Sequence, residues 1–266
     1  MASSGIKRVG VVGFDGVGGP WLAEAETPRL RAFFREGAFT TEARTVLPSS
    51  SYPAWGSMLT GISPDQHHAT EQHQFTAASP CPTWLLRLSQ AWGNPPVGVF
   101  AAWPPIVGDL LEPEVGATRV QGPDDVLVAL FEPYLRHARP RLLFLYLGDP
   151  DDVGHAHGYR SPEYWASVQR ADRRFGLALE ALDESGLAEE TLVVTLSDHG
   201  GVGKSHGGDS PEELTIFWAC RGPGVTRGKQ LNTPVSVMDT AAVILAWAGL
   251  PLPTEMEGRV PPGVLD

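Results

Sequence analysis

Seven side chains of the kinds that bind metal ions follow four predicted strands of this 266-residue chain. Each stands at or shortly after the end of an apolar run: Asp15, Ser51, Asp151, His155, Asp198, His199 and His206. Carboxylate oxygens and imidazole nitrogens, without thiolates, suit Zn²⁺, Mn²⁺ or similar ions. Seven ligands divide naturally between two metals about 4 Å apart, an arrangement that clamps the attacking and leaving oxygens in phosphoryl transfer. The pattern therefore predicts a two-metal site for phosphoryl chemistry.

Ser51 lies in the stretch Val46–Gly61, where three successive serines follow a predicted strand. Pro53 is expected to open a short helix that runs to about Leu59, because proline is favoured at a first helical position. Ser51 would then precede a helix N-terminus, where free N–H groups and the helix dipole favour an anionic oxygen. Taken alone, this stretch favours an N-cap serine. The ligands predicted at other strand ends favour a nucleophile instead.

Neighbouring residues of the same types leave parts of the ligand set open. His157 is a possible substitute for His155, and Asp149 and Asp152 compete with Asp151. Taken singly, each proposed ligand has an ordinary explanation, such as a helix cap, a turn aspartate or a loop histidine. Taken together, those explanations require several coincidences at one sheet edge. The metal site is therefore favoured.

Strands that alternate with helices must position these side chains. Strands are predicted at Arg8–Phe14, Thr40–Val46, Val97–Phe100, Leu142–Leu147, Leu192–Ser197 and Thr215–Ala219, and helices at 28–36, 84–92, 124–137, 162–185 and 239–248. This order predicts an α/β protein, a single domain over residues 1–266 with a mainly parallel central sheet and helices on both faces. Ligands of such sheets gather beyond the carboxyl ends of the strands, where the seven side chains are expected.

Composition indicates a globular protein and argues against some partners. Hydrophobic residues make up 42% of the chain and charged residues 19%, and no apolar run approaches the length of a membrane span. The net charge of −11 argues against a nucleic-acid groove. A small phosphorylated substrate is compatible with that charge if bound divalent metals supply positive charge. The start of the chain has no signal-peptide core, so a cytoplasmic location is expected. The sequence gives no indication of oligomeric state.

These motifs, in their order along the chain, resemble the alkaline phosphatase superfamily, and most closely its nucleotide pyrophosphatase/phosphodiesterase branch. The matching segments are Phe14-Asp15-Gly16, Pro48–Pro53 with Thr60-Gly61, Pro150-Asp151 with Gly154-His155, Ser197–Gly200, and His206-Gly207 before Gly222-Pro223-Gly224. The resemblance implies an alkaline phosphatase-like fold and a Ser51 nucleophile that forms a phosphoseryl intermediate. It implies one metal ion held by Asp151, His155 and His206. It implies a second ion held by Asp15, Asp198, His199 and the Ser51 oxygen. The family usually uses two zinc ions and sometimes manganese.

Some positions depart from the pattern of the branch. Ser51 stands where the branch usually has threonine, and Pro53-Ala54 where it has Pro-Asn. The asparagine that helps to hold the phosphoryl oxygen is nearest here to Gln72, which is therefore the candidate substrate-binding residue. The chain is also short for the family. Small substrate-selecting caps are therefore expected at about 62–95 and 101–122.

The sequence thus predicts a metal-dependent phosphoester hydrolase of the phosphodiesterase or nucleotide pyrophosphatase type. One alternative is a phosphomonoesterase, or another phosphoryl, sulfuryl or phosphonyl hydrolase of the superfamily. Another is a non-catalytic metal-stabilised binding protein, which ranks last because all seven ligand-type residues are present. Tyr52, Trp55 and Trp103 could stack on a nucleobase, although aromatic residues near helices more often belong to the core.

Overall fold

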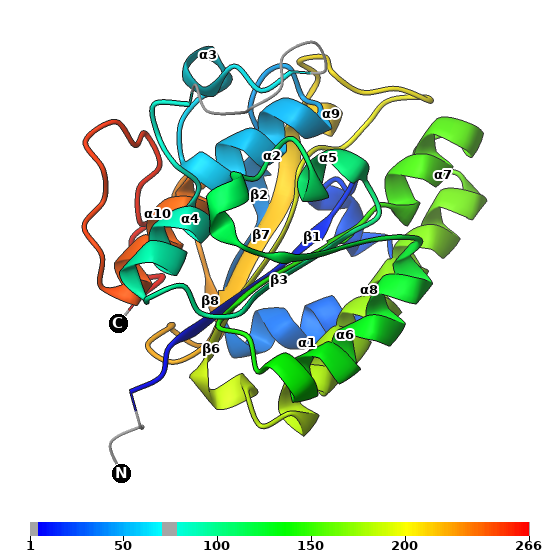
Figure 1. Cartoon of the computed structure of the whole chain (residues 1–266). Helices are drawn as coiled ribbons and strands as arrows, with labels where there is room; N and C mark the ends of the chain where they lie inside the picture. The colour runs from blue at the N-terminus through cyan, green and yellow to red at the C-terminus, as the bar shows by residue number, and fades with distance from the viewer. Residues whose placement is uncertain (1–4, 71–78, 266) are drawn as a thin grey trace.

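A computed structural model describes residues 5–70 and 79–265 of the chain (Figure 1). Its centre is an eight-stranded sheet in the order β4-β3-β5-β1-β6-β7-β2-β8. The strands are β1 (Arg8–Phe14), β2 (Ala38–Arg44), β3 (Val97–Ala101), β4 (Thr118–Gln121), β5 (Leu142–Leu147), β6 (Thr191–Ser197), β7 (Thr215–Arg221) and β8 (Lys229–Gln230). Strands β4, β3, β5, β1 and β6 are parallel, and β7 is antiparallel to its neighbours β6 and β2. The predicted α/β fold with a mainly parallel sheet is confirmed.

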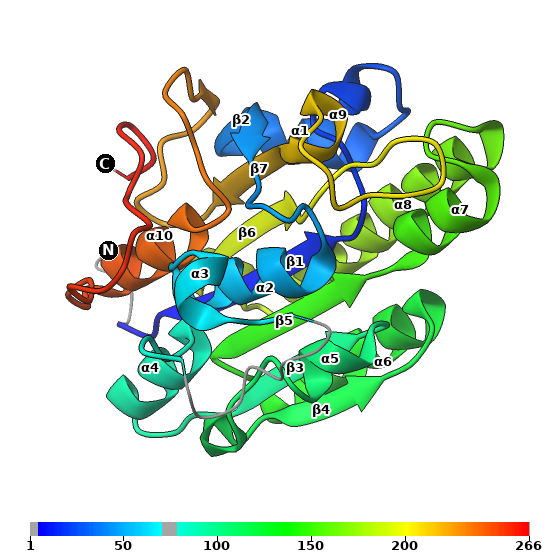
Figure 2. The same cartoon turned by 90° about the horizontal axis from the view of Figure 1, so that it is seen from above.

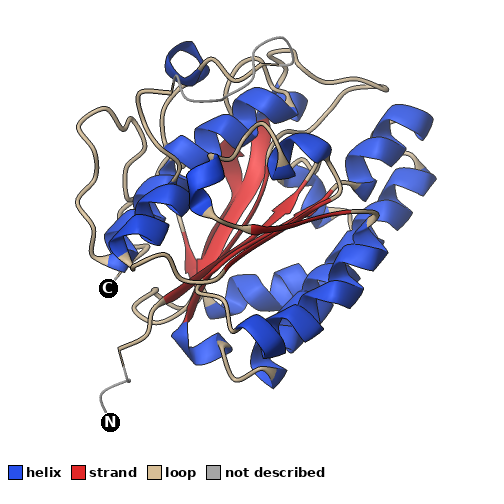
Figure 3. Cartoon of the chain, viewed as in Figure 1, coloured by secondary structure: helices blue, strands red, loops and turns tan. Residues whose placement is uncertain are grey.

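Helices cover both faces of the sheet (Figure 3). The helices are α1 (Pro28–Glu36), α2 (Ser51–Thr60), α3 (Pro64–His67), α4 (Trp84–Ala91), α5 (Pro104–Val107), α6 (Asp124–Ala138), α7 (Asp149–His157), α8 (Pro162–Glu184), α9 (Pro211–Leu214) and α10 (Asp239–Ala248), with 3₁₀ turns η1 (Pro20–Ala23), η2 (Pro113–Val115) and η3 (Ala188–Glu190). Helices α2, α4 and α10 pack on one face and α1, α6 and α8 on the other, and each layer encloses its own apolar core. Figure 2 looks down on the α2 layer. No helix of the described part of the chain is both long and apolar enough to cross a membrane.

Strand register brings the predicted ligands to one edge of the sheet. Phe14 of β1 lies opposite Leu147 of β5 and Ser197 of β6. Asp15, which follows Phe14, and Asp198, which follows Ser197, therefore lie at the same edge of the sheet. Every residue of β1, β5 and β6 is buried, as expected for central parallel strands.

Helix α2 packs unusually close to the sheet because Gly13 has no side chain. A Cβ atom at Gly13 would lie 2.3 Å from the Trp55 ring. Trp55 is fully buried at this contact, so it belongs to the core and is wrong as a candidate for stacking on substrate. The close contact sets the N-terminus of α2, and with it Ser51, beside the end of β1.

Several elements differ from their predicted limits. Helix α2 begins at Ser51 rather than at Pro53, so Ser51 lies in the first turn and Ser50 is the N-cap residue. Proline is tolerated there because the first N–H groups of a helix lack intrahelical partners. Strand β2 covers Ala38–Arg44, two residues earlier than predicted. Two segments for which no helix or strand was predicted contain one: α7 follows β5, and β4, a short half-exposed edge strand, lies within the 101–122 segment.

Candidate metal centre

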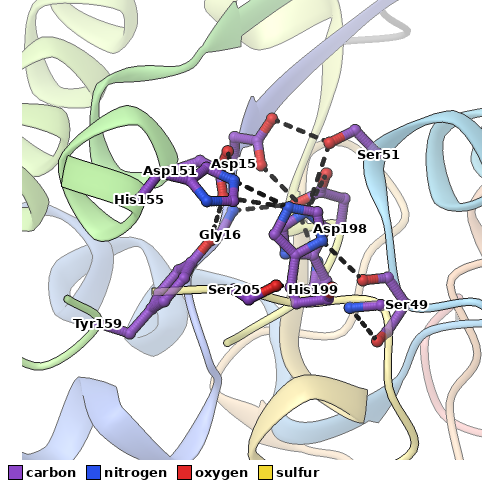
Figure 4. Close-up of polar contacts among 12 residues, drawn as sticks. Asp15, Gly16, Ser49, Ser51, Asp151, His155, Tyr159, Asp198, His199 and Ser205 are labelled. Carbon is purple, nitrogen blue, oxygen red and sulfur yellow. Dashed lines mark hydrogen bonds and ion pairs between the residues drawn. The ribbon is translucent and has the colours of Figure 1, made fainter. Parts of the chain in front are cut away.

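Ser51 lies beside three predicted ligands that follow β1 and β6. The Oγ atom of Ser51 is 3.3 Å from Nε2 of His199 and 3.5 Å from Oδ2 of Asp15. The same nitrogen of His199 is 3.3 Å from Oδ1 of Asp15 and 3.4 Å from Oδ2 of Asp198. Figure 4 shows these side chains converging from separate elements. The structure thus brings the predicted nucleophile together with the three residues predicted to share its metal ion.

The other three predicted ligands form an adjacent group. His206 Nε2 is 3.1 Å from His155 Nε2 and 3.8 Å from Oδ1 of Asp151, and His155 Nε2 is 3.3 Å from Oδ2 of Asp151. The rings of His199 and His206 stack with centroids 3.8 Å apart. Donor atoms of Asp15, Asp151 and His199 also lie within 4.8 Å of one another. The two groups therefore share one continuous site.

Each of the three carboxylates has one oxygen held by hydrogen bonds and one that faces a histidine Nε2. The donors are the Tyr146 hydroxyl to Asp15, the Tyr159 hydroxyl to Asp151, and the amides of Gly16 and His199 to Asp198. Oδ1 of Asp15 and Oδ2 of Asp198 are buried and have no hydrogen-bond partner within the described residues. Burial of an ionised oxygen without a partner is costly. These two oxygens therefore fit the role of ligands to a cation.

The pKa values of the buried carboxyl groups also fit a role as ligands to a cation. Burial raises the pKa of Asp15 well above its usual value, and the charges of Asp198 and Asp151 raise it further. Burial likewise raises the pKa of Asp198. A divalent cation at close range favours the charged form of both groups and offsets their repulsion. The donor set of carboxylate oxygen, imidazole nitrogen and one hydroxyl suits zinc or manganese.

The three histidines are fixed in one tautomer by backbone carbonyls. Nδ1 of His155 lies 2.9 Å from the carbonyl oxygen of Lys204, and Nδ1 of His199 lies 2.8 Å from that of Gly200. Nδ1 of His206 lies 3.1 Å from the carbonyl oxygen of Ser49. A carbonyl can only accept, so each Nδ1 donates and each Nε2 keeps its lone pair for the site, as in many metal centres. Burial lowers the pKa of His206 to about 4. Neutral imidazole is the form that binds metal.

The alternative ligands lie outside these two groups. Asp149 is engaged by Arg170 at 2.8 and 3.0 Å and by Arg174 at 2.8 Å. Asp152 and His157 point from exposed positions of α7, and neither belongs to a cluster of potential ligands among the described residues. Gln72 lies outside the described residues, so its proposed role in substrate binding stays a prediction.

Four residues that contact the ligands were not predicted. Tyr146 lies within the apolar run of β5 and Tyr159 follows α7, and nothing in their sequence context indicates where their hydroxyls point. Gly16 supplies an amide to Asp198. Ser49 holds the loop after His206, since its hydroxyl donates to the Gly208 carbonyl at 2.6 Å and accepts from the Gly207 amide at 3.2 Å. A spacing rule for metal ligands does not find such supporting residues.

An aromatic pair lies at the start of α2. Tyr52 and Trp103 are both partly exposed, and their rings meet edge to face with centroids 4.7 Å apart. The Tyr52 hydroxyl donates to Oδ2 of Asp109 at 3.2 Å. Trp103 and Asp109 come from the 101–122 segment, which therefore lies next to the start of α2.

The fold and the site define the class of protein: an α/β protein with two adjacent groups of potential metal ligands, and a serine beside them, at the carboxyl edge of the sheet. The family model described as type I phosphodiesterase / nucleotide pyrophosphatase matches residues 9–102 and 117–206, more than half of the chain. The chain belongs to this family.

Curated relatives agree with this assignment over part of their length. Ectonucleotide pyrophosphatase/phosphodiesterase family member 1 of Mus musculus is 26% identical over 190 residues, which cover 62% of this chain and 20% of that protein. An uncharacterized pyrophosphatase/phosphodiesterase of Schizosaccharomyces pombe is 26% identical over 216 residues, 71% of this chain and 44% of that protein. An endo-4-O-sulfatase of Bacteroides thetaiotaomicron is 36% identical over 104 residues, 36% of this chain and 20% of that protein. The chain thus spans less than half of the length of these relatives.

Solved structures match the fold across nearly the whole chain. Murine ectonucleotide pyrophosphatase/phosphodiesterase 5 superposes with a TM-score of 0.75 at 15% identity, covering 93% of this chain and 96% of that chain. A Bacteroides thetaiotaomicron structure from a glycosaminoglycan-metabolism locus has a TM-score of 0.75 at 17% identity, covering 95% and 75%. These neighbours confirm the alkaline phosphatase-like fold that the sequence predicts.

Proposed function

We propose that this protein hydrolyses phosphoric esters, with a preference for phosphodiester or nucleotide pyrophosphate bonds, and that Ser51 is its nucleophile. The observation that carries the proposal is the position of the Ser51 hydroxyl, 3.3 Å from His199 and 3.5 Å from Asp15. It lies beside a carboxylate with a buried oxygen that has no hydrogen-bond partner in the part of the chain that the structure describes. Membership of the type I phosphodiesterase / nucleotide pyrophosphatase family supports it.

Two divalent cations, most simply Zn²⁺ with Mn²⁺ as the alternative, fit the ligand set. Asp151, His155 and His206 would hold one cation, and the second would be held by Asp15, Asp198, His199 and the Ser51 oxygen. When bound, such cations lower the pKa of a neighbouring hydroxyl and neutralise charge on phosphoryl oxygens.

The chain itself orients the nucleophile. Ser51 occupies the first turn of α2, where N–H groups without intrahelical partners and the helix dipole favour negative charge on its oxygen and on the phosphoryl group. Attack by Ser51 Oγ on phosphorus forms a phosphoseryl ester and releases the leaving alcohol or phosphate. Water then hydrolyses this ester and restores the Ser51 hydroxyl.

A small nucleotide-like phosphoester is the proposed substrate class. One solved relative is an inactive variant of murine ectonucleotide pyrophosphatase/phosphodiesterase 5 in complex with AMP. The Tyr52 and Trp103 rings here offer flat apolar surface next to Ser51. We propose that the 62–95 and 101–122 segments act as small caps over the site, with Trp103 the part of the second cap nearest to the substrate.

A monoester hydrolase is the second candidate, because part of the chain is similar to a sulfatase. The sulfatase motif C/S-x-P-x-R is incomplete here, however. Ser51-Tyr52-Pro53 supplies its first half, but Trp55 stands in place of the arginine and is buried in the core. The incomplete motif argues against sulfate esters, and membership of the phosphodiesterase family ranks phosphodiesters ahead of phosphate monoesters.

A substrate panel on zinc-reconstituted protein tests the proposal. The panel compares bis-p-nitrophenyl phosphate, p-nitrophenyl phenylphosphonate, p-nitrophenyl phosphate and p-nitrocatechol sulfate. A kcat/KM for the diester or phosphonate ester that exceeds the phosphate monoester value supports the proposed preference. Faster turnover of either monoester favours the second candidate, and zinc binding without turnover of any ester favours a binding protein.

A further inference from the structure

Helix α7 carries two proposed ligands but buries little apolar surface. Along its nine residues only Pro150 and Gly154 are buried, and Val153 packs partly buried against the apolar core. Asp151 and His155 stand one turn apart on it, and His155 is exposed. Hydrophobic packing therefore contributes little to the precise position of the two ligands, and other contacts must set it.

The N-terminus of α7 is capped by a residue from another helix. Gly148, the N-cap residue, has no side chain to offer. Instead the Gly148 amide donates to Oδ1 of Asp124 at 3.0 Å, and the Asp149 amide donates to Oδ2 of Asp124 at 3.2 Å. Asp124 is the first residue of α6 and is only 5% exposed. One buried carboxylate thus binds both amides at the point where α7 begins.

A buried arginine fixes that carboxylate in turn. Arg174, in the middle of α8, lies 3.2 Å from Oδ2 of Asp124 and 2.8 Å from Oδ2 of Asp149. Arg170, one turn earlier on α8, binds both oxygens of Asp149. The network therefore ties the starts of α6 and α7 to the centre of α8. Removing one partner of such a buried ion pair is strongly destabilising, because the other charge then stays buried without a partner.

We infer that Asp124 is a positioning residue for the cation site formed by Asp151, His155 and His206, which it serves by fixing the start of α7 against α6 and α8. The inference rests on the proposed function, because it assigns Asp124 to the support of a proposed metal ligand set. It also predicts an asymmetry. The set formed by Asp15, Asp198, His199 and Ser51 has no proposed ligand on α7, although Asp151 of α7 lies within 4.8 Å of donor atoms of Asp15 and His199. That set is therefore expected to depend less on Asp124.

The test is zinc affinity, measured for each site separately by competition with a chromophoric chelator. The His199→Ala background isolates the site of Asp151, His155 and His206, and the His206→Ala background isolates the other. In the first background Asp124→Ala is expected to weaken zinc binding about 10- to 100-fold, the usual effect of removing support from a ligand. In the His206→Ala background the loss of affinity is expected to be clearly smaller, because α7 supplies no proposed ligand to that site. Equal losses in both backgrounds, or no loss in either, would overturn the inference.

Asp125 provides a matched control. Its side chain is 82% exposed and bonds the same Arg174 at 2.8 Å, but among the described residues it makes no hydrogen bond or ion pair with α7. Asp125→Ala is expected to keep the parent affinity at both sites. A loss equal to that of Asp124→Ala would assign the effect to Arg174 or to surface charge and would refute the capping role. If Asp124→Ala does not fold, Asp124→Asn replaces it, with a smaller loss expected at the same site only.

Amide hydrogen exchange of zinc-free protein separates this inference from the proposed function. In Asp124→Ala the amides of 148–157 are expected to exchange at least tenfold faster than in the parent, while those of β5 keep their rates. Unchanged exchange in α7 would refute the anchoring role of Asp124. A parent protein that binds neither zinc nor manganese would instead refute the proposed function, and the exchange result would still test the anchoring role of Asp124.

Discussion

The hydroxyl of Tyr146, near the end of β5, donates a hydrogen bond to the carboxylate of Asp15, the residue that follows β1. The bond engages Oδ2 of Asp15, while Oδ1 of the same carboxylate faces His199 at 3.3 Å. Both residues are almost fully buried. The hydrogen bond from the Tyr146 hydroxyl therefore occupies Oδ2 of Asp15 and leaves Oδ1 available to a cation. Strand β5, which carries Tyr146, supplies no ligand itself.

Replacement of Tyr146 by phenylalanine removes this donor and keeps the ring in the core. We expect zinc affinity at the site that contains Asp15 to fall about 10- to 100-fold, as it does when a ligand loses its hydrogen-bonding partner. The readout is chelator competition on the full chain. Tyr134→Phe is the control, since the Tyr134 hydroxyl bonds the Val97 carbonyl instead of a ligand. Parent affinity in Tyr146→Phe would contradict the supporting role.

Replacement of Ser51 by alanine tests the nucleophile directly. The variant should bind zinc and keep its melting temperature within about 2 °C, because Ser51 is only partly buried. Its kcat should fall by several orders of magnitude, since removing a covalent nucleophile leaves only binding and electrostatic effects. Steady-state kinetics with the preferred ester give the value. Turnover within tenfold of the parent would remove Ser51 from the mechanism.

The structure brings the predicted ligands together because the signals that predict their positions are local in the sequence. Asp15, Asp198 and His199 each follow a strand whose apolar pattern is clear, and parallel register places such residues at one edge without further detail. The supporting residues lack that local signal. Tyr146 sits in an apolar run where only its ring is expected to matter, and Asp124 acts on a helix that begins 25 residues later.

The limits of helices and strands were likewise predicted well only where the sequence signal is local. The prediction for Asp239–Ala248 matches α10, whose ends are marked by an aspartate and a glycine. Helix α7 was missed because its sequence, rich in aspartate and glycine, is typical of a loop. Its capping carboxylate comes from another part of the chain, so the stabilising contact is invisible to a local pattern. Strand β4 is short and half-exposed, which gives too little alternation for a prediction.

Metal removal provides the third prediction. Chelation should abolish ester hydrolysis, and Zn²⁺ or Mn²⁺ should restore it. Free metal at 100 times its dissociation constant should also stabilise the fold by about 2.7 kcal/mol per site, because the cation binds the folded state. Thermal unfolding with and without metal measures this stabilisation of the fold independently of turnover. Indifference of both activity and melting temperature to chelator would contradict the metal-centre assignment.

The pH dependence of stability gives a fourth prediction, at a histidine away from the metal centre. His67 is 3% exposed, and its ring nitrogens meet the Ser57 hydroxyl at 3.0 Å and the Ala69 amide at 2.9 Å. Because the Ala69 amide donates to Nδ1, the neutral ring carries its proton on Nε2. Burial lowers the pKa of His67 from 6.5 to about 4 in the folded state. The unfolded chain therefore binds more protons than the folded one between these values.

The sign of the effect follows from this difference in proton binding. The contribution of neutral His67 is fully present above about pH 6.5 and is lost as the pH falls toward 4, with an upper limit of about 3 kcal/mol. Urea unfolding at pH 7 and pH 4.5 measures it in the parent and in His67→Gln. Every other titrating group is common to both proteins, so the variant should lose less stability on acidification. Equal losses in the two proteins would show that His67 does not titrate with a lowered pKa, and that its ring takes up a proton without cost to the fold.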